Sequence, residues 1–130
     1  MKINTFDIDG VIYFGEQATG VRPGEDDVII TGRPFHAREE TEKMLHSRGI
    51  YNTVYMNPLA RKIGYEDNPL YGRKASGIWK AHMISYLQDL GYEIVMHFED
   101  DPVQIDEIKK KHPDLSIVHL VRENEERVKY

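Results

Sequence analysis

The chain contains no cysteine. That absence excludes disulfide bonds and metal sites built from thiolate ligands, and it agrees with a reducing compartment. The histidines do not show the spacing of metal ligands, and we expect them to be structural or on the surface. They are His36, His46, His82, His97, His112 and His119.

The chain also lacks a long hydrophobic run. No apolar stretch approaches the ~20 residues needed to cross a bilayer, and the opening MKINTF has no apolar core or small-residue cleavage site of a secretory signal. We therefore expect a cytoplasmic protein with no membrane partner. The net charge of −5 excludes a general nucleic-acid binder but leaves a local basic patch open.

What the sequence does contain fits one globular domain over all 130 residues, 40% of them hydrophobic and 30% charged. Short apolar segments typical of strands alternate with patterns typical of helices. The predicted strands are 3–8, 28–31, 52–56, 93–98 and 116–121, and the predicted helices are 37–48, 75–90 and 102–111. This alternation predicts an α/β fold, with a five-stranded, mostly parallel, doubly wound sheet between two helical layers.

Two segments rich in glycine and proline, 13–27 and 57–74, are predicted to be loops or small hairpins, and 13–27 would form a short flap. In the helix 75–90, one apolar stripe is expected to face the core, with Trp79 buried in it. The stripe consists of Ile78, Trp79, Met83, Ile84, Leu87 and Leu90. Gly91 stands where a helix is expected to end, and Pro102 where one is expected to begin.

Polar residues follow the predicted strands. In the stretch FDIDGV, Asp7 and Asp9 flank Ile8, so that in a strand both carboxylates would lie on the same side. Two close carboxylates repel each other, which leaves three interpretations: a metal site, a catalytic pair, or a strand that ends in solvent.

Similar polar groups follow other strands and begin a helix. They are Thr31, Gly32 and Arg33; Lys80 in the first turns of its helix; and Glu99, Asp100 and Asp101. In a parallel sheet all these strand ends lie at one edge, where open α/β sheets bind ligands.

These segments together resemble the four motifs of the haloacid dehalogenase (HAD) superfamily. FDIDGV resembles motif I and VIITGR motif II, Lys80 in SGIWKAHMISYL is placed like the motif III lysine, and HFEDDP resembles motif IV. The resemblance extends from residue 3 to about residue 108. The D-x-D-G pattern alone also occurs in calcium loops, so the weight lies in four motifs in the right order.

The resemblance implies an Mg²⁺-dependent phosphatase that forms an aspartyl-phosphate on Asp7. Asp9 would be the general acid and base. Thr31, the N–H of Gly32, Arg33 and Lys80 would bind the substrate's phosphoryl group, and Lys80 would also restrain Asp7. Mg²⁺ would be held by Asp7, by a backbone carbonyl of Ile8 or Asp9, and by Asp100. Glu99 is the alternative to Asp100, and Lys74 the alternative to Lys80.

The spacing between the motifs leaves no room for the cap domain that many members of the superfamily insert. A capless site suits a large substrate, and the resemblance to nucleic-acid 3′-phosphatase domains suggests a nucleic-acid end or a nucleotide. Residues of the flanking loops would line the entrance: Tyr13, Phe14, Arg22, Arg33, His36, Arg61, Lys62 and Arg73.

Other interpretations remain open. A receiver-like signalling domain also combines aspartates, threonine and lysine, but it carries its phosphorylated aspartate on the third strand, where this chain has Tyr55, Met56 and Asn57. A non-catalytic metal-binding module is the other alternative. At the level of single residues, Thr31, Asp100 and Asp101 could merely cap helices. The sequence leaves the oligomeric state open.

Overall fold

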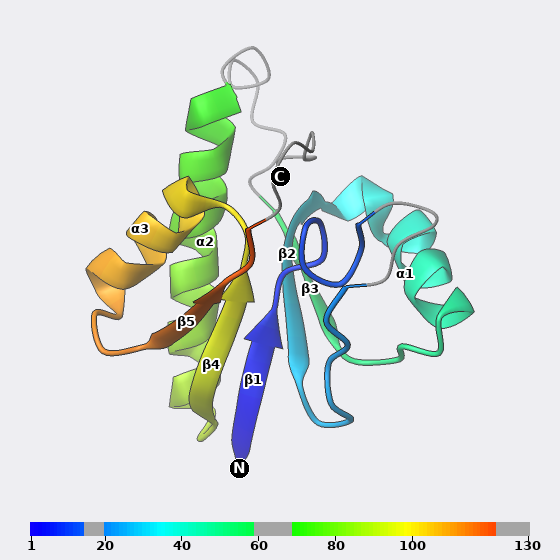
Figure 1. The fold of residues 1–130 in the computed structure, drawn as a ribbon, viewed down its shortest axis with the longest axis horizontal. Helices are drawn as coiled ribbons and strands as arrows, with labels where there is room; N and C mark the ends of the chain where they lie inside the picture. The colour runs from blue at the N-terminus through cyan, green and yellow to red at the C-terminus, as the bar shows by residue number, and fades with distance from the viewer. Residues whose placement is uncertain (15–19, 59–68, 122–130) are drawn as a thin grey trace.

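A computed structural model describes residues 1–14, 20–58 and 69–121 of the chain, and it contains the predicted five-stranded parallel sheet. The strands are β1 (Lys2–Phe6), β2 (Val28–Pro34), β3 (Val54–Asn57), β4 (Glu93–Glu99) and β5 (Ser116–His119). They lie in the order β3-β2-β1-β4-β5, and every neighbouring pair is parallel. The order reverses direction at β1, which places the carboxyl end of β1 in the middle of one sheet edge (Figure 1).

Helices cover both faces of this sheet. The 3₁₀ turn η1 (Phe35–Ala37) leads into α1 (Arg38–Ser47), which packs on one face, while α2 (Pro69–Asp89) and α3 (Pro102–Lys111) pack on the other (Figure 1). Alternate residues of β2 supply the two cores. Ile30 joins the cluster under α2 and α3, and Ile29 joins the cluster under α1 with Leu45. Because both faces are covered, the first three residues of β2, Val28, Ile29 and Ile30, are all apolar.

The helix α2 is longer than the sequence predicts. It begins at Pro69, six residues before the expected start at residue 75, because proline is tolerated in a first turn and Gly72 weakens the helical pattern without ending it. Lys80 therefore lies in the middle of α2 and not in its first turns.

The apolar stripe of α2 is confirmed in part. Trp79, Ile84 and Leu87 are buried, but Ile78 is 40% exposed and Leu90 55% exposed. The predicted helix ends are confirmed: Gly91 has a φ of 101° directly after α2, and Pro102 is the first residue of α3. None of the helices in the described ranges is both long and apolar enough to cross a membrane.

A β-bulge interrupts the pairing of β1 with β4. Ile3 lies opposite Ile94, but Thr5 lies opposite His97, so β4 carries one extra residue between these two positions. Because side chains alternate along a strand, one extra residue turns the rest of β4 over. His97 and Glu99 consequently lie on the same sheet face as Ile94, under α2.

Candidate active site

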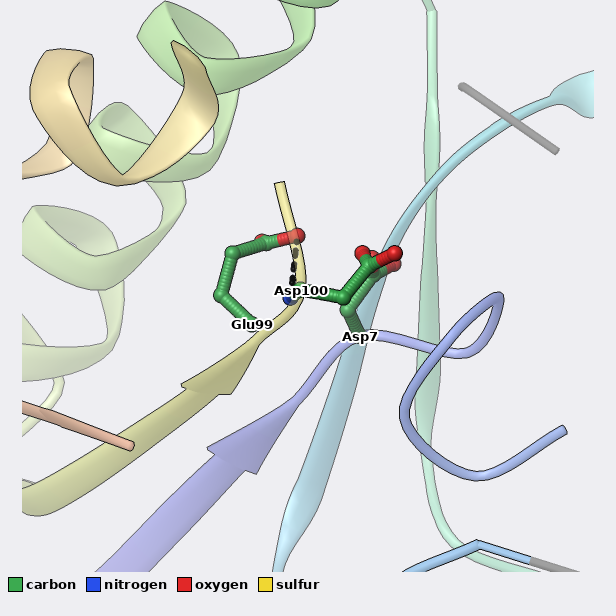
Figure 2. Close-up of side chains that lie close together, drawn as sticks. All are labelled: Asp7, Glu99 and Asp100. Carbon is green, nitrogen blue, oxygen red and sulfur yellow. Dashed lines mark hydrogen bonds between the residues drawn. The ribbon is translucent and has the colours of Figure 1, made fainter. Parts of the chain in front are cut away.

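Three buried carboxylates meet at the carboxyl ends of β1 and β4. Asp7 follows β1, Glu99 is the last residue of β4, and Asp100 follows it (Figure 2). Each side chain offers an oxygen atom that lies within 4.8 Å of an oxygen of both others. Their exposed fractions are 5%, 0% and 3%. This convergence was expected, because neighbouring parallel strands end at the same edge of the sheet.

Lys80 lies against this cluster. The Nζ atom of Lys80 is 2.8 Å from Oε1 of Glu99 and 3.2 Å from Oδ1 of Asp7, and its side chain is fully buried. Lys74, the alternative motif III residue, has an exposed side chain. The structure therefore brings Lys80, and not Lys74, to the carboxylates.

Burial and the neighbouring charges determine the ionisation of this group. Burial raises the pKa of Asp7 well above its ordinary value, the charge of Glu99 raises it further, and Lys80 opposes both. Burial alone would raise the pKa of Glu99, but Lys80 and His97 outweigh burial, so this pKa lies well below its usual range. Burial would lower the pKa of Lys80, but Asp7 and Glu99 raise it. Glu99 and Lys80 thus form an ion pair, and Asp7 is the carboxyl whose negative charge a further cation would stabilise.

The hydrogen bonds distinguish Glu99 from Asp100. Oε1 of Glu99 accepts from Lys80 and from Nε2 of His97, at 2.8 Å and 3.1 Å. Its Oε2 accepts the backbone N–H groups of Asp100 and Asp101, at 3.3 Å and 3.5 Å. Glu99 is therefore committed to protein donors at both oxygens, which favours Asp100 as the residue that faces a metal ion.

Asp101 has a structural role. It is the N-cap of α3 and accepts the backbone N–H of Val103 at 3.0 Å. Its two oxygens also accept from Nε and Nη2 of Arg73, at 2.9 Å and 2.6 Å. The helix-capping interpretation is thus correct for Asp101, whereas Asp100 belongs to the acidic cluster. Arg73, expected at the substrate entrance, instead joins α2 to α3.

The residue at position 10 must be very small. Gly10 has a φ of 81°, and a Cβ atom placed on it would lie 2.1 Å from Oδ2 of Asp100. Glycine therefore meets two requirements at once: it adopts a left-handed conformation, and it lets the β1 loop approach the Asp100 carboxylate. The G of the D-x-D-G pattern has a direct steric explanation here.

Asp7 and Asp9 have different partners. β1 ends at Phe6, and residues 8–12 form a turn, so strand alternation does not govern the direction of these side chains. The Asp9 carboxylate accepts from Nε and Nη2 of Arg33, at 2.8 Å and 2.7 Å, and Nη1 of Arg33 donates to Thr41 at 3.1 Å. The described acidic cluster does not include Asp9. The metal ligand expected at this position is a backbone carbonyl of Ile8 or Asp9, which the pairing of the Asp9 carboxylate does not test. Arg33 binds a protein carboxylate at the place where a substrate contact was expected.

The other polar residues of the VIITGR segment belong to the neighbouring strand, β2. Thr31 and Gly32 lie within β2, so Thr31 does not cap a helix. The Thr31 side chain is fully buried, and its hydroxyl oxygen accepts the backbone N–H of Arg33 at 3.1 Å. Because β1 and β2 are adjacent, Thr31 stands beside the turn that carries Asp7 and Asp9.

The predicted entrance is only partly described. Arg22 donates to the backbone carbonyls of Arg48 and Gly49, at 2.7 Å and 2.8 Å, and so serves the structure of the loop. The guanidinium of Arg48 lies 4.5 Å from the ring centre of Tyr13. Arg61 and Lys62 lie outside the described residues.

Sequence reasoning missed two features of the site. The first is the pairing of Asp9 with Arg33, which depends on how the turn after β1 folds. The second is His97, whose ring is fully buried and hydrogen-bonded to Glu99. The alternation of His97 with Glu99 along β4 was a usable signal, since both side chains had to share a face of that strand.

The described residues fit a divalent cation with oxygen ligands. Asp7 and Asp100 offer carboxylate oxygens, Gly10 makes room for the Asp100 carboxylate itself, and Lys80 neutralises Glu99. Comparisons with protein-family models, curated proteins and solved structures found no match to this chain, so that the family resemblance depends on the motifs alone.

Proposed function

We propose that this protein is an Mg²⁺-dependent phosphomonoesterase of the HAD type, with Asp7 as its nucleophile. One observation carries the proposal. A fully buried lysine lies between the carboxylate at the end of β1 and the carboxylate at the end of β4, at 3.2 Å and 2.8 Å. A buried charge is costly unless paired, and core packing gives no reason for this group. An anionic substrate that must approach the Asp7 carboxylate does give a reason for a buried positive charge at this place.

Asp7 and Asp100 would hold the metal ion. When bound, Mg²⁺ would supply positive charge that offsets the repulsion between the Asp7 carboxylate and a phosphate dianion. The raised pKa of Asp7 without a cation agrees with this need. Glu99 contributes indirectly, by holding Lys80.

The first step transfers the phosphoryl group to Asp7. A carboxylate oxygen of Asp7 forms a bond to phosphorus while the bond from phosphorus to the leaving oxygen breaks. Asp9, in its protonated form, gives its proton to that leaving oxygen. Lys80 and the Thr31 hydroxyl, which can donate while its oxygen accepts from Arg33, stabilise the transferring oxygens.

The second step releases inorganic phosphate. A water molecule attacks phosphorus, Asp9 accepts its proton, and the bond between phosphorus and Asp7 breaks. Asp9 in its ionised form would accept this proton. The bidentate contact with Arg33, at 2.7 Å and 2.8 Å, orients the Asp9 carboxylate.

The substrate class is proposed from the short connections between the elements of the site. The proposal includes nucleic-acid ends and nucleotides as the first substrates to test, since the sequence has no room for a cap over the site.

The test is phosphate release with and without Mg²⁺, from p-nitrophenyl phosphate, nucleotides, sugar phosphates and oligonucleotides phosphorylated at either end. We expect activity with Mg²⁺, loss of it in EDTA, and at least a hundredfold loss in Asp7→Asn, because an amide cannot replace the attacking carboxylate. Asp106→Asn changes an exposed carboxylate of α3 in the same way and serves as the matched control.

Three results would contradict the proposal. Full activity in Asp7→Asn would remove the nucleophile from the account. A phosphoryl adduct that persists without turnover would favour the receiver-like alternative, and Mg²⁺ binding without turnover across the panel would favour the non-catalytic one.

A further inference from the structure

A line of buried polar side chains continues from the active site into the core. Thr5 on β1 and His97 on β4 lie opposite each other in the sheet, and both side chains are fully buried. The Thr5 hydroxyl oxygen is 2.7 Å from Nδ1 of His97, and Nε2 of His97 is 3.1 Å from Oε1 of Glu99. Two apolar residues would fill this space without the cost of burying polar atoms.

The chemistry of the partners fixes the direction of each hydrogen bond. An ionised Glu99 only accepts, so Nε2 of His97 must carry a hydrogen. In a neutral ring Nδ1 is then an acceptor, and the Thr5 hydroxyl must donate to it. Burial lowers the pKa of His97, although Glu99 opposes this, and the neutral ring is therefore the expected form.

The β-bulge makes this arrangement possible. Without the extra residue in β4, Thr5 would lie opposite Met96, and both His97 and Glu99 would face away from α2. With the extra residue in β4, Oε1 of Glu99 accepts hydrogen bonds from Nε2 of His97 at 3.1 Å and from Nζ of Lys80 at 2.8 Å. The bulge thus aligns four residues from two strands and a helix: Thr5, His97, Glu99 and Lys80.

We propose that Thr5 and His97 are positioning residues of the proposed phosphatase. They hold the Glu99 carboxylate against Lys80, and Lys80 thereby stays directed at Asp7. This inference rests on the proposed function, and it concerns two residues to which the resemblance gives no role.

The test compares two pairs of variants, one at Thr5 and one at His97. Thr5→Val removes the hydroxyl but keeps the shape, and Thr5→Ser keeps the hydroxyl. With p-nitrophenyl phosphate and Mg²⁺ we expect Thr5→Val to lower kcat about tenfold with little change in KM, and Thr5→Ser to stay within about twofold of the wild type. His97→Gln, which can still place an N–H against Glu99, should retain far more activity than His97→Leu. If Thr5→Val does not fold, the comparison of His97→Gln with His97→Leu tests the inference.

A second measurement does not depend on activity. Nitrogen-15 NMR of the wild-type imidazole should show a hydrogen on Nε2 and none on Nδ1 of His97 at neutral pH. A ring protonated on Nδ1, or on both nitrogens, would overturn the inference. Equal kcat in the wild type and Thr5→Val would also overturn it while leaving the proposed function intact. A wild type without any phosphatase activity would refute the proposed function and the inference with it.

Discussion

At the scale of single residues, the site depends on which partner each charged group takes. Lys80 lies between Asp7 and Glu99, Arg33 holds Asp9, and Arg73 holds Asp101. These three cations separate the acidic residues at this sheet edge into groups with different roles. Asp100 is the acidic residue that Gly10 approaches most closely.

Gly10 provides a direct test of that approach. Gly10→Ala should destabilise the protein and abolish Mg²⁺-dependent activity, because the new Cβ would collide with the Asp100 carboxylate. Gly91→Ala is the matched control, since Gly91 also has a positive φ, of 101°, but a Cβ there meets no atom within 4 Å. Chemical denaturation should give a loss of about 1–2 kcal/mol in Gly91→Ala from backbone strain alone, and a larger loss in Gly10→Ala. Equal losses, with activity kept in both variants, would contradict the proposed contact.

The pairing of Arg33 with Asp9 predicts a dependence on the leaving group. Arg33→Met should reduce hydrolysis of alkyl phosphate esters, which need a proton on the leaving oxygen, about tenfold more than hydrolysis of p-nitrophenyl phosphate. The reason is that Asp9 loses the contacts at 2.7 Å and 2.8 Å that orient it. Parallel kinetics on both esters measure this. If Arg33 instead binds substrate, KM should rise equally for both.

At the scale of elements, much of the fold could be predicted because its signals are local. Each strand is a short apolar run, and Gly91 and Pro102 mark helix ends through their own backbone preferences. The start of α2 was predicted wrongly, since a helix that includes Gly72 has no local signal to distinguish it from a loop. The bulge in β4 was not predicted either, because it depends on pairing between strands far apart in the sequence.

Close packing of α2 on α3 leads to a prediction about two glycines of one helix. A Cβ on Gly77 would lie 2.8 Å from Cα of Gln104 in α3, whereas a Cβ on Gly72 would meet no atom of the described residues within 4 Å. Gly72→Ala should therefore stabilise the protein by about 0.5–1 kcal/mol. Gly77→Ala should destabilise the protein. The collision with Gln104 costs about 1–3 kcal/mol, and the higher helix propensity of alanine offsets part of this cost.

Thermal and chemical denaturation of the two variants provide the test. Opposite signs are expected for the same substitution, made five positions apart on one helix. Stabilisation in both variants would mean that α2 and α3 are not in the close contact described here.

At the scale of the whole molecule, the convergence of the site could be predicted but its internal contacts could not. Parallel strands must end at a common edge, so Asp7, Thr31 and Asp100 had to be neighbours once the sheet was recognised. The choice of Arg33 for Asp9, and of His97 for Glu99, depends on a turn and a bulge whose geometry only the folded chain specifies.

The central claim is that Asp7 becomes phosphorylated during turnover, and trapping the acyl phosphate tests it most directly. Enzyme quenched during turnover of p-nitrophenyl phosphate with Mg²⁺ is treated with borohydride, which reduces an acyl phosphate to an alcohol, and peptides are then sequenced by mass spectrometry. We expect reduction at Asp7 only, dependent on both substrate and Mg²⁺. Reduction at another carboxylate, or at none while phosphate is being released, would contradict it.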